Sequence, residues 1–312
     1  MNIKDKIQGV LFGGAIGDAL GLGTEFMTKT EVQKYYPNGL HDYSQIVQDY
    51  HRSRWQRGDW TDDTDMMLCI ANAIIKDKEI IPLNIANEFY LWVKEGRAMG
   101  IGRTTYNVLT FPQYREYPYK AANMVWEFSH YKNAANGGVM RTPIIGLWNE
   151  NIERYAEDVC KLTHPDPRCV GSCVIISLLV HSLVYYNEII PLNQLIDIGN
   201  RYDNRIEECL HLTQTESLDS FYLDKEGEQG YTLKAMSAAI WCLFHCNSFE
   251  EGLLTIVNAG GDADTNATVT CSLLGAKFGY NAIPNNYVDG LIKKEYLTAI
   301  ADKLIGNITR AI

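Results

Sequence analysis

The chain has 312 residues, of which 46% are hydrophobic and 21% are charged. This composition excludes a disordered or fibrous protein and allows a large buried core. The formal net charge of −10 at pH 7 argues against a general nucleic-acid-binding protein. The eight cysteines include no CxxC pair, so no structural zinc site is expected and the thiols are interpreted as reduced core residues. The N-terminal stretch has no clear signal-peptide cleavage site, and we expect a cytoplasmic protein.

Apolar residues recur at helical spacing along most of the chain, as in Met67, Ile70, Ala71 and Ile74. In chain order, helices are predicted near 3–20, 67–74, 83–95, 120–128, 153–163, 169–187, 193–201, 205–212, 232–246, 249–258, 267–278 and 289–306. Alternating strand patterns are scarce and no linker or internal repeat is found. The sequence therefore predicts an all-α protein with a single domain over residues 1–312.

Less regular segments separate these helices, at 28–60, 96–119, 129–144 and 213–231. Loops of this length in a helical protein often form functional surfaces. The first of them carries a basic stretch with Arg52, Arg54 and Arg57, which we interpret as a solvated loop.

The segment 169–187 raises the question of a membrane span. It contains no formally charged side chain and is close to the length that crosses a bilayer. Gly171, several serines and His181 make it less apolar than a typical span. We interpret it as the central core helix and expect no membrane association.

A first acidic cluster lies at the predicted start of a helix, where Thr61, Asp62, Asp63 and Asp65 precede an apolar run. No Lys or Arg occurs between residues 58 and 74 to neutralise them. Asp and Thr are good helix N-caps, and carboxylates in the first turn are favoured by the helix dipole. One cluster alone would therefore be explained by helix capping.

A second cluster repeats the pattern, with Asp262, Asp264 and Thr265 ahead of another apolar helix and no Lys or Arg between residues 258 and 276. Two such clusters hold more carboxylates than capping needs, and clustered carboxylates repel unless they protonate or bind a cation. Oxygen ligands without Cys or His favour Mg²⁺, Mn²⁺ or Ca²⁺ over zinc. The predicted metal ligands, enough for a two-metal centre, are Thr61, Asp62, Asp63, Asp262, Asp264 and Thr265.

Five motifs, taken together and in order, resemble the ADP-ribosylglycohydrolase family, and the most similar members are bacterial ones related to the dinitrogenase-reductase-activating glycohydrolase. The motifs are GDALGLGTEF (17–26), WTDDTDM (60–66), NGGVMR (136–141), THPDPR (163–168) and GGDADTNA (260–267). The resemblance covers nearly the whole chain. It implies a compact orthogonal helix bundle with two Mg²⁺ or Mn²⁺ ions at the base of a cleft.

The resemblance also implies hydrolysis of the glycosidic bond between ADP-ribose and an acceptor, with mono-ADP-ribosylarginine on a protein as the first expectation. Glu25 matches the acidic residue that the family places beside the metals, so the expected catalytic residues are Glu25, Asp62 and Asp264. The expected substrate-binding residues are Gly100, Ile101, Gly102, Thr104, Asn136 and His164. Asp18 is expected to be structural, while Arg141 either pairs with an acid or contacts a phosphate.

Cleavage of such a bond passes through an oxocarbenium-like transition state, which a negative site stabilises. Glu25 would then take a proton from water or assist the leaving group. Two other functions stay open at this point: a non-catalytic ADP-ribose or nucleotide binder, and a two-metal phosphohydrolase of nucleotides. The substrate is expected to be an ADP-ribosylated protein or another ADP-ribosylated molecule, and the protein is expected to be a monomer.

Overall fold

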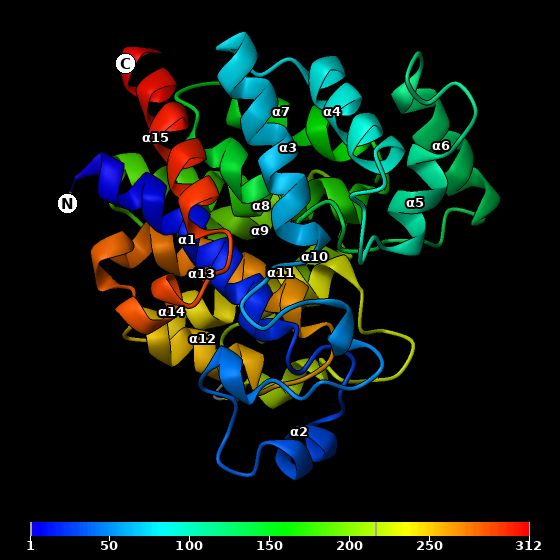
Figure 1. Ribbon diagram of the computed structural model, residues 1–312. Helices are drawn as coiled ribbons and strands as arrows, with labels where there is room; N and C mark the ends of the chain where they lie inside the picture. Colours follow the sequence, from blue (N-terminus) through cyan, green and yellow to red (C-terminus); the bar gives the residue numbers. More distant parts are fainter. Residues whose placement is uncertain (1, 216, 312) are drawn as a thin grey trace.

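The computed structural model describes residues 2–215 and 217–311, and these contain helices and no strand (Figure 1). The all-α prediction is confirmed. The α-helices are α1 (Ile3–Gly21), α2 (Lys29–Tyr35), α3 (Asp62–Asp77), α4 (Pro82–Lys94), α5 (Arg103–Leu109), α6 (Pro118–Phe128), α7 (Ile152–Lys161), α8 (Pro167–His181), α9 (Leu192–Asn200), α10 (Arg205–Leu212), α11 (Thr232–His245), α12 (Phe249–Val257), α13 (Ala263–Phe278), α14 (Asn285–Asp289) and α15 (Lys294–Ala311).

Helices α1 and α13 form a tightly packed central pair (Figure 1). Glycines at every fourth position of α1 allow this close approach: Gly9, Gly13, Gly17 and Gly21. An added Cβ on any of them would lie 2.2–2.5 Å from a backbone carbonyl oxygen of α13. Because the two backbones touch, the C-terminal end of α1 lies against the first turn of α13, where the second acidic cluster is located.

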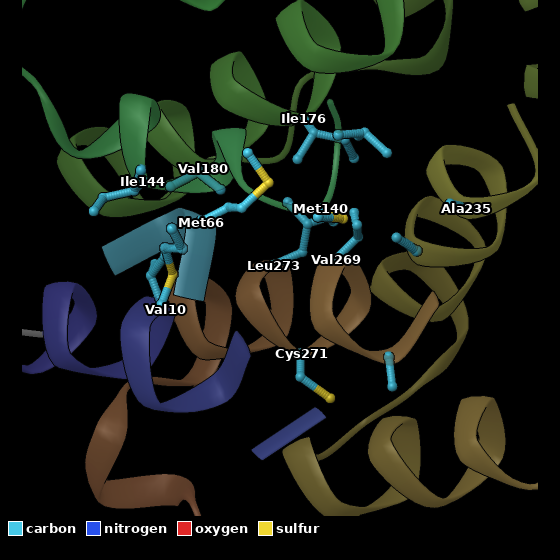
Figure 2. Close-up of a cluster of buried hydrophobic side chains, with 14 of the residues drawn as sticks. Val10, Met66, Met140, Ile144, Ile176, Val180, Ala235, Val269, Cys271 and Leu273 are labelled. Atoms are coloured by element: carbon cyan, nitrogen blue, oxygen red, sulfur yellow. The ribbon is translucent and has the colours of Figure 1, made fainter. Parts of the chain in front are cut away.

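The hydrophobic core surrounds this pair, and side chains of α1, α3, α8, α11 and α13 meet in it (Figure 2). Met66 of α3 and Val10 of α1 lie together there. Residues Pro167–Tyr186 are long and apolar enough to cross a membrane, but 72% of their most apolar window is buried inside the protein. This is the placement predicted for a core helix.

The irregular segments are more ordered than the sequence pattern predicted. Helix α2 lies within 28–60 and begins with a capping box between Thr28 and Glu31, and α5 lies within 96–119. Each has only seven residues, too few for apolar periodicity to stand out. The last helix begins at Lys294, because Gly290 closes the short α14 before it.

The interpretation of the basic stretch as a solvated loop is wrong for Arg52. This side chain is buried, and its guanidinium donates hydrogen bonds to the carbonyl oxygens of Gly23 and Glu25 while pairing with Asp49. Arg52 is therefore a structural cation that holds the backbone next to Glu25 in place.

Candidate functional site

The first acidic cluster occupies the start of α3, and Asp18 of α1 caps this helix. The Asp18 carboxylate accepts hydrogen bonds from the backbone N–H groups of Thr61 and Thr64, both at 3.0 Å, and from the Thr64 hydroxyl at 2.6 Å. Since Asp18 satisfies these donors, helix capping leaves the carboxylates of Asp62 and Asp63 free for another role.

Asp65 lies in the same turn but points elsewhere. Its two carboxylate oxygens accept hydrogen bonds from the indole N–H groups of Trp60, at 2.9 Å, and Trp92, at 3.1 Å. Asp65 thus ties α3 to its neighbours and takes no part in the carboxylate cluster.

The second cluster follows two glycines in the left-handed region, Gly260 and Gly261, each with φ of +73°. Backbone hydrogen bonds join this turn to residues 26 and 27: Phe26 N–H donates to Gly261 O at 2.6 Å, and Gly261 N–H donates to Met27 O at 2.8 Å. An added Cβ at Gly261 would lie 2.2 Å from the Leu223 carbonyl oxygen, so only glycine fits. This pairing brings the loop that carries Glu25 beside the start of α13.

The two clusters and Glu25 converge in space. Carboxylate oxygens of Glu25, Asp262 and Asp264 lie within 4.8 Å of one another, and all three residues are buried. The hydroxyl of Thr61 lies 3.4 Å from Asp264 Oδ2, which joins the start of α3 to the start of α13. Residues more than 200 positions apart in the chain thus share one site.

Burial raises the pKa of each carboxyl group in this site, and repulsion between carboxylates raises several of them further. Burial is the main cause for Asp62, Asp63, Asp264 and Glu25, and neighbouring carboxylates add to it. Burial also raises the pKa of Asp18 to about 6, against the lowering effect of its hydrogen bonds. The site therefore favours either protons or a cation that replaces them.

The residues fit a divalent cation. Asp63 Oδ1 is buried and has no hydrogen-bond partner among the described residues, so its lone pairs are available to a cation. The available donors are carboxylate and threonine oxygens, the ligands preferred by Mg²⁺ and Mn²⁺. A buried acidic cluster of this kind can hold a metal ion.

A cavity of about 370 Å³ opens above the carboxylates. The predicted site residues that line it are Glu25, Asp62, Asp63, Gly100, Gly102, Thr104, Asn136, His164, Asp262, Asp264 and Thr265. Thr61 lies behind this lining, buried at the N-cap of α3. Ile101 is half-buried and packs against the hydrophobic core, so the structure separates its side chain from the residues that line the cavity.

The glycine loop before α5 touches the acidic cluster directly. Gly100 has φ of +93°, and an added Cβ would lie 2.8 Å from Asp62 Oδ1 and 3.1 Å from the Trp55 ring. Gly102 has open space around it and an ordinary φ of −63°. Only the first of these two glycines is required by its position.

Asn136 acts on the acidic cluster from a distant loop. Its side-chain amide donates a hydrogen bond to Asp262 Oδ2 at 2.7 Å, and its backbone N–H donates to Gly230 O at 3.0 Å. Asn136 therefore fixes the orientation of one carboxylate in addition to lining the cavity.

His51 is a site residue that sequence analysis did not find. Its Nε2 lies 2.6 Å from Glu25 Oε2, and its Nδ1 faces the Arg54 guanidinium. Because a guanidinium only donates, His51 Nδ1 accepts and Nε2 donates to the Glu25 carboxylate. No sequence pattern around His51 indicates this contact, because only the fold of the 46–57 loop brings His51 beside Glu25.

A buried group of carboxylates at the base of a cavity is typical of hydrolases that use divalent cations. The comparisons with known proteins agree. The family model described as ADP-ribosylglycohydrolase matches residues 1–311, and the chain belongs to this family. It is an enzyme that hydrolyses the glycosidic bond of ADP-ribose, and the resemblance identified from the motifs is confirmed.

Two relatives and one solved structure illustrate the similarity. The chain is 27% identical to the ADP-ribosyl-[dinitrogen reductase] glycohydrolase of Rhodospirillum rubrum, over 94% of this chain and 92% of the relative. It is 25% identical to the ADP-ribosylarginine hydrolase Tri1 of Serratia proteamaculans, over 96% and 79%. A solved ADP-ribosylglycohydrolase-related protein complex superposes with a TM-score of 0.75 at 25% identity, covering 97% of each chain.

Proposed function

We propose that this enzyme removes mono-ADP-ribose from arginine side chains of proteins. The observation that carries the proposal is the convergence of Glu25, Asp262 and Asp264 beneath the cavity. The names of two relatives, one acting on ADP-ribosylarginine and one on an ADP-ribosylated protein, support this linkage.

We further propose that the site holds two divalent cations, Mg²⁺ or Mn²⁺. Their ligands would be Thr61, Asp62, Asp63, Asp262, Asp264 and Thr265, and the unpartnered oxygen of Asp63 supports this set. When bound, such ions supply charge neutralisation and lower the pKa of a coordinated water. Asn136 holds the Asp262 carboxylate in one orientation, so this ligand needs little rearrangement.

Glu25 is proposed as the residue that exchanges a proton with the attacking water or the leaving group, with Asp62 and Asp264 beside it. The His51 hydrogen bond occupies one Glu25 oxygen, Oε2, and Glu25 lines the cavity. The negative charge of the surrounding carboxylates stabilises a positively charged ribose ring in the transition state.

The remaining substrate contacts are proposed from the lining of the cavity. Gly100, Gly102 and Thr104 would bind the ribose and phosphates through the backbone, with Asn136 and His164 across from them. Ile101 would contact the substrate only through its backbone, because its half-buried side chain packs against the hydrophobic core. We also propose that the chain is one domain, a monomer and cytoplasmic.

The test is a panel of defined ADP-ribosyl linkages on peptides, incubated with and without added Mg²⁺ or Mn²⁺. Release of free ADP-ribose from the arginine linkage, lost after chelation and restored by metal, supports the proposal. Preference for a serine or nucleic-acid linkage overturns the arginine assignment. Release of AMP or phosphate identifies a phosphohydrolase instead. The Asp264→Asn variant controls for contaminating activity.

A further inference from the structure

Arg141 is a buried cation in an unusual position next to the cavity. Its side chain is fully buried, with the guanidinium carbon 4.6 Å from the centre of the Phe89 ring and Nη1 3.6 Å from Met66 Sδ. Among the described residues no carboxylate pairs with it, and its Nε has no acceptor. Arg141 therefore neither pairs with an acid nor lines the cavity to contact a phosphate. An uncompensated buried charge is costly, so an apolar side chain would pack here at lower cost.

The best hydrogen bond of Arg141 goes to Thr163. Arg141 Nη2 donates to Thr163 Oγ1 at 2.6 Å, and the same oxygen lies 2.7 Å from His164 Nδ1. The guanidinium can only donate, so Thr163 Oγ1 is its acceptor. The Thr163 hydroxyl also has one hydrogen to donate, and among the described contacts of Thr163 the acceptor within reach is His164 Nδ1. We infer from this pairing that Nδ1 of His164 accepts and that the ring carries its hydrogen on Nε2.

The other side of the His164 ring faces the cavity. His164 is 2% exposed and lines the cavity together with Gly137 and Thr105. Its Nε2 is buried and has no hydrogen-bond partner among the described residues. Gly137 leaves this face of the ring open, since a Cβ there would lie 3.1 Å from Nε2 and 2.9 Å from Thr105 Oγ1. A buried donor without an acceptor is unfavourable unless a ligand or water supplies one.

The charge of the ring agrees with this arrangement. Burial, and then the nearby Arg141 charge, lower the pKa of His164 to about 3. The ring is therefore neutral at physiological pH, and a neutral imidazole has one donor and one acceptor. Which nitrogen donates is decided by the Thr163 hydroxyl.

We propose that Arg141 and Thr163 are positioning residues that hold His164 with its hydrogen on Nε2, so that the ring donates a hydrogen bond to an oxygen of the bound ADP-ribosyl group. The inference rests on the substrate contact of His164 proposed above. It adds the donor atom and the two residues that select it. Arg141 acts without touching the substrate, by polarising the Thr163 hydroxyl toward Nδ1.

The experiment combines ring NMR with binding of ADP-ribose to the full-length protein. Two-bond ¹H–¹⁵N spectra assign the hydrogen of His164, and calorimetry measures ADP-ribose affinity. Thr163→Val removes the hydroxyl at nearly constant shape, and Thr163→Ser is the matched control that keeps it. We expect a single Nε2–H form in the wild type, a mixture of forms in Thr163→Val with roughly two- to tenfold weaker binding, and both properties retained in Thr163→Ser.

A double-mutant cycle tests whether Thr163 acts through His164. In a His164→Gln background, Thr163→Val should cause no further loss of affinity, because the ring that it positions is absent. Equal losses in both backgrounds would overturn the proposal. So would a hydrogen on Nδ1 of His164 in the wild type, a measurement that depends on no variant. None of these readouts needs turnover, so a failure to cleave ADP-ribosylarginine would reject the proposed linkage and leave this inference standing.

Discussion

Replacing Asp18 by Asn tests how the burial of a carboxyl group in this site makes the stability of the protein depend on pH. Asp18 is fully buried and caps α3 from α1. Burial raises its pKa from an ordinary 3.8 to about 6. The folded protein therefore binds this proton more tightly than the unfolded chain does. The stability that Asp18 contributes is full below the unfolded pKa and is lost as pH rises through about 6.

The magnitude follows from the two pKa values. Between about pH 5 and pH 7.5, the Asp18 contribution to the free energy of unfolding of the metal-free protein should fall by roughly 1.4 kcal/mol. Asn does not titrate, so the Asp18→Asn variant lacks this term. His164 has a lowered pKa and works in the opposite direction, but it is present in both proteins and cancels in their difference. The Asp18 charge also raises the pKa of Asp62, Asp63 and Asp264, so their loss of stability with rising pH is smaller in the variant and adds to the difference with the same sign.

The assay is urea unfolding followed by far-UV circular dichroism at both pH values, on metal-stripped wild type and Asp18→Asn. The wild type should lose stability relative to the variant as the pH rises. Saturating Mg²⁺ should reduce this difference, because a nearby cation lowers the pKa of Asp18. If both proteins change in parallel without metal, the carboxyl is ionised throughout and the reasoning is refuted.

Three further substitutions test individual parts of the site. Asp264→Asn should abolish turnover and lower the metal content measured by mass spectrometry, with the helical signal retained; wild-type metal content and activity would contradict the ligand assignment. Glu25→Gln should lower turnover on the order of 10²- to 10⁴-fold with metal content unchanged, and a fully active variant would remove Glu25 from the chemistry. Gly100→Ala should reduce turnover and cost roughly 1–2 kcal/mol of stability, because Gly100 has φ of +93° and its new Cβ would press on the Asp62 carboxylate. Gly102→Ala, in open space at an ordinary φ, is its stability control and should keep the wild-type free energy of unfolding.

Much of the fold was predictable because helices depend on local pattern. Most of the predicted helices are present within a few residues, since apolar periodicity and end signals act within one or two turns. The short helices α2 and α5 were missed because seven residues carry too little periodicity. The glycine spacing of α1 was in plain view, but its partner on α13 lies more than 240 residues away.

The site was predictable as a set of residues, since two cation-free acidic clusters are visible without any structure. Their partners were not. Asp18 caps α3, His51 contacts Glu25, and Asn136 orients Asp262 through contacts that no spacing indicates. Ile101 shows the converse, since it was expected to bind the substrate but its half-buried side chain packs against the hydrophobic core.

The amino-acid sequence by itself determined the helical class, the two acidic helix starts and the family, because each of these depends on short, local segments of the chain. The tertiary structure alone decided which carboxylates lie together and which side chains form hydrogen bonds with them. Arg141 illustrates the difference, because it could have paired with an acid but instead bonds to Thr163 behind His164. A buried charged or polar group needs a hydrogen-bond partner, and in this site the partners come from distant segments of the chain. These segments become neighbours only when the tertiary structure forms.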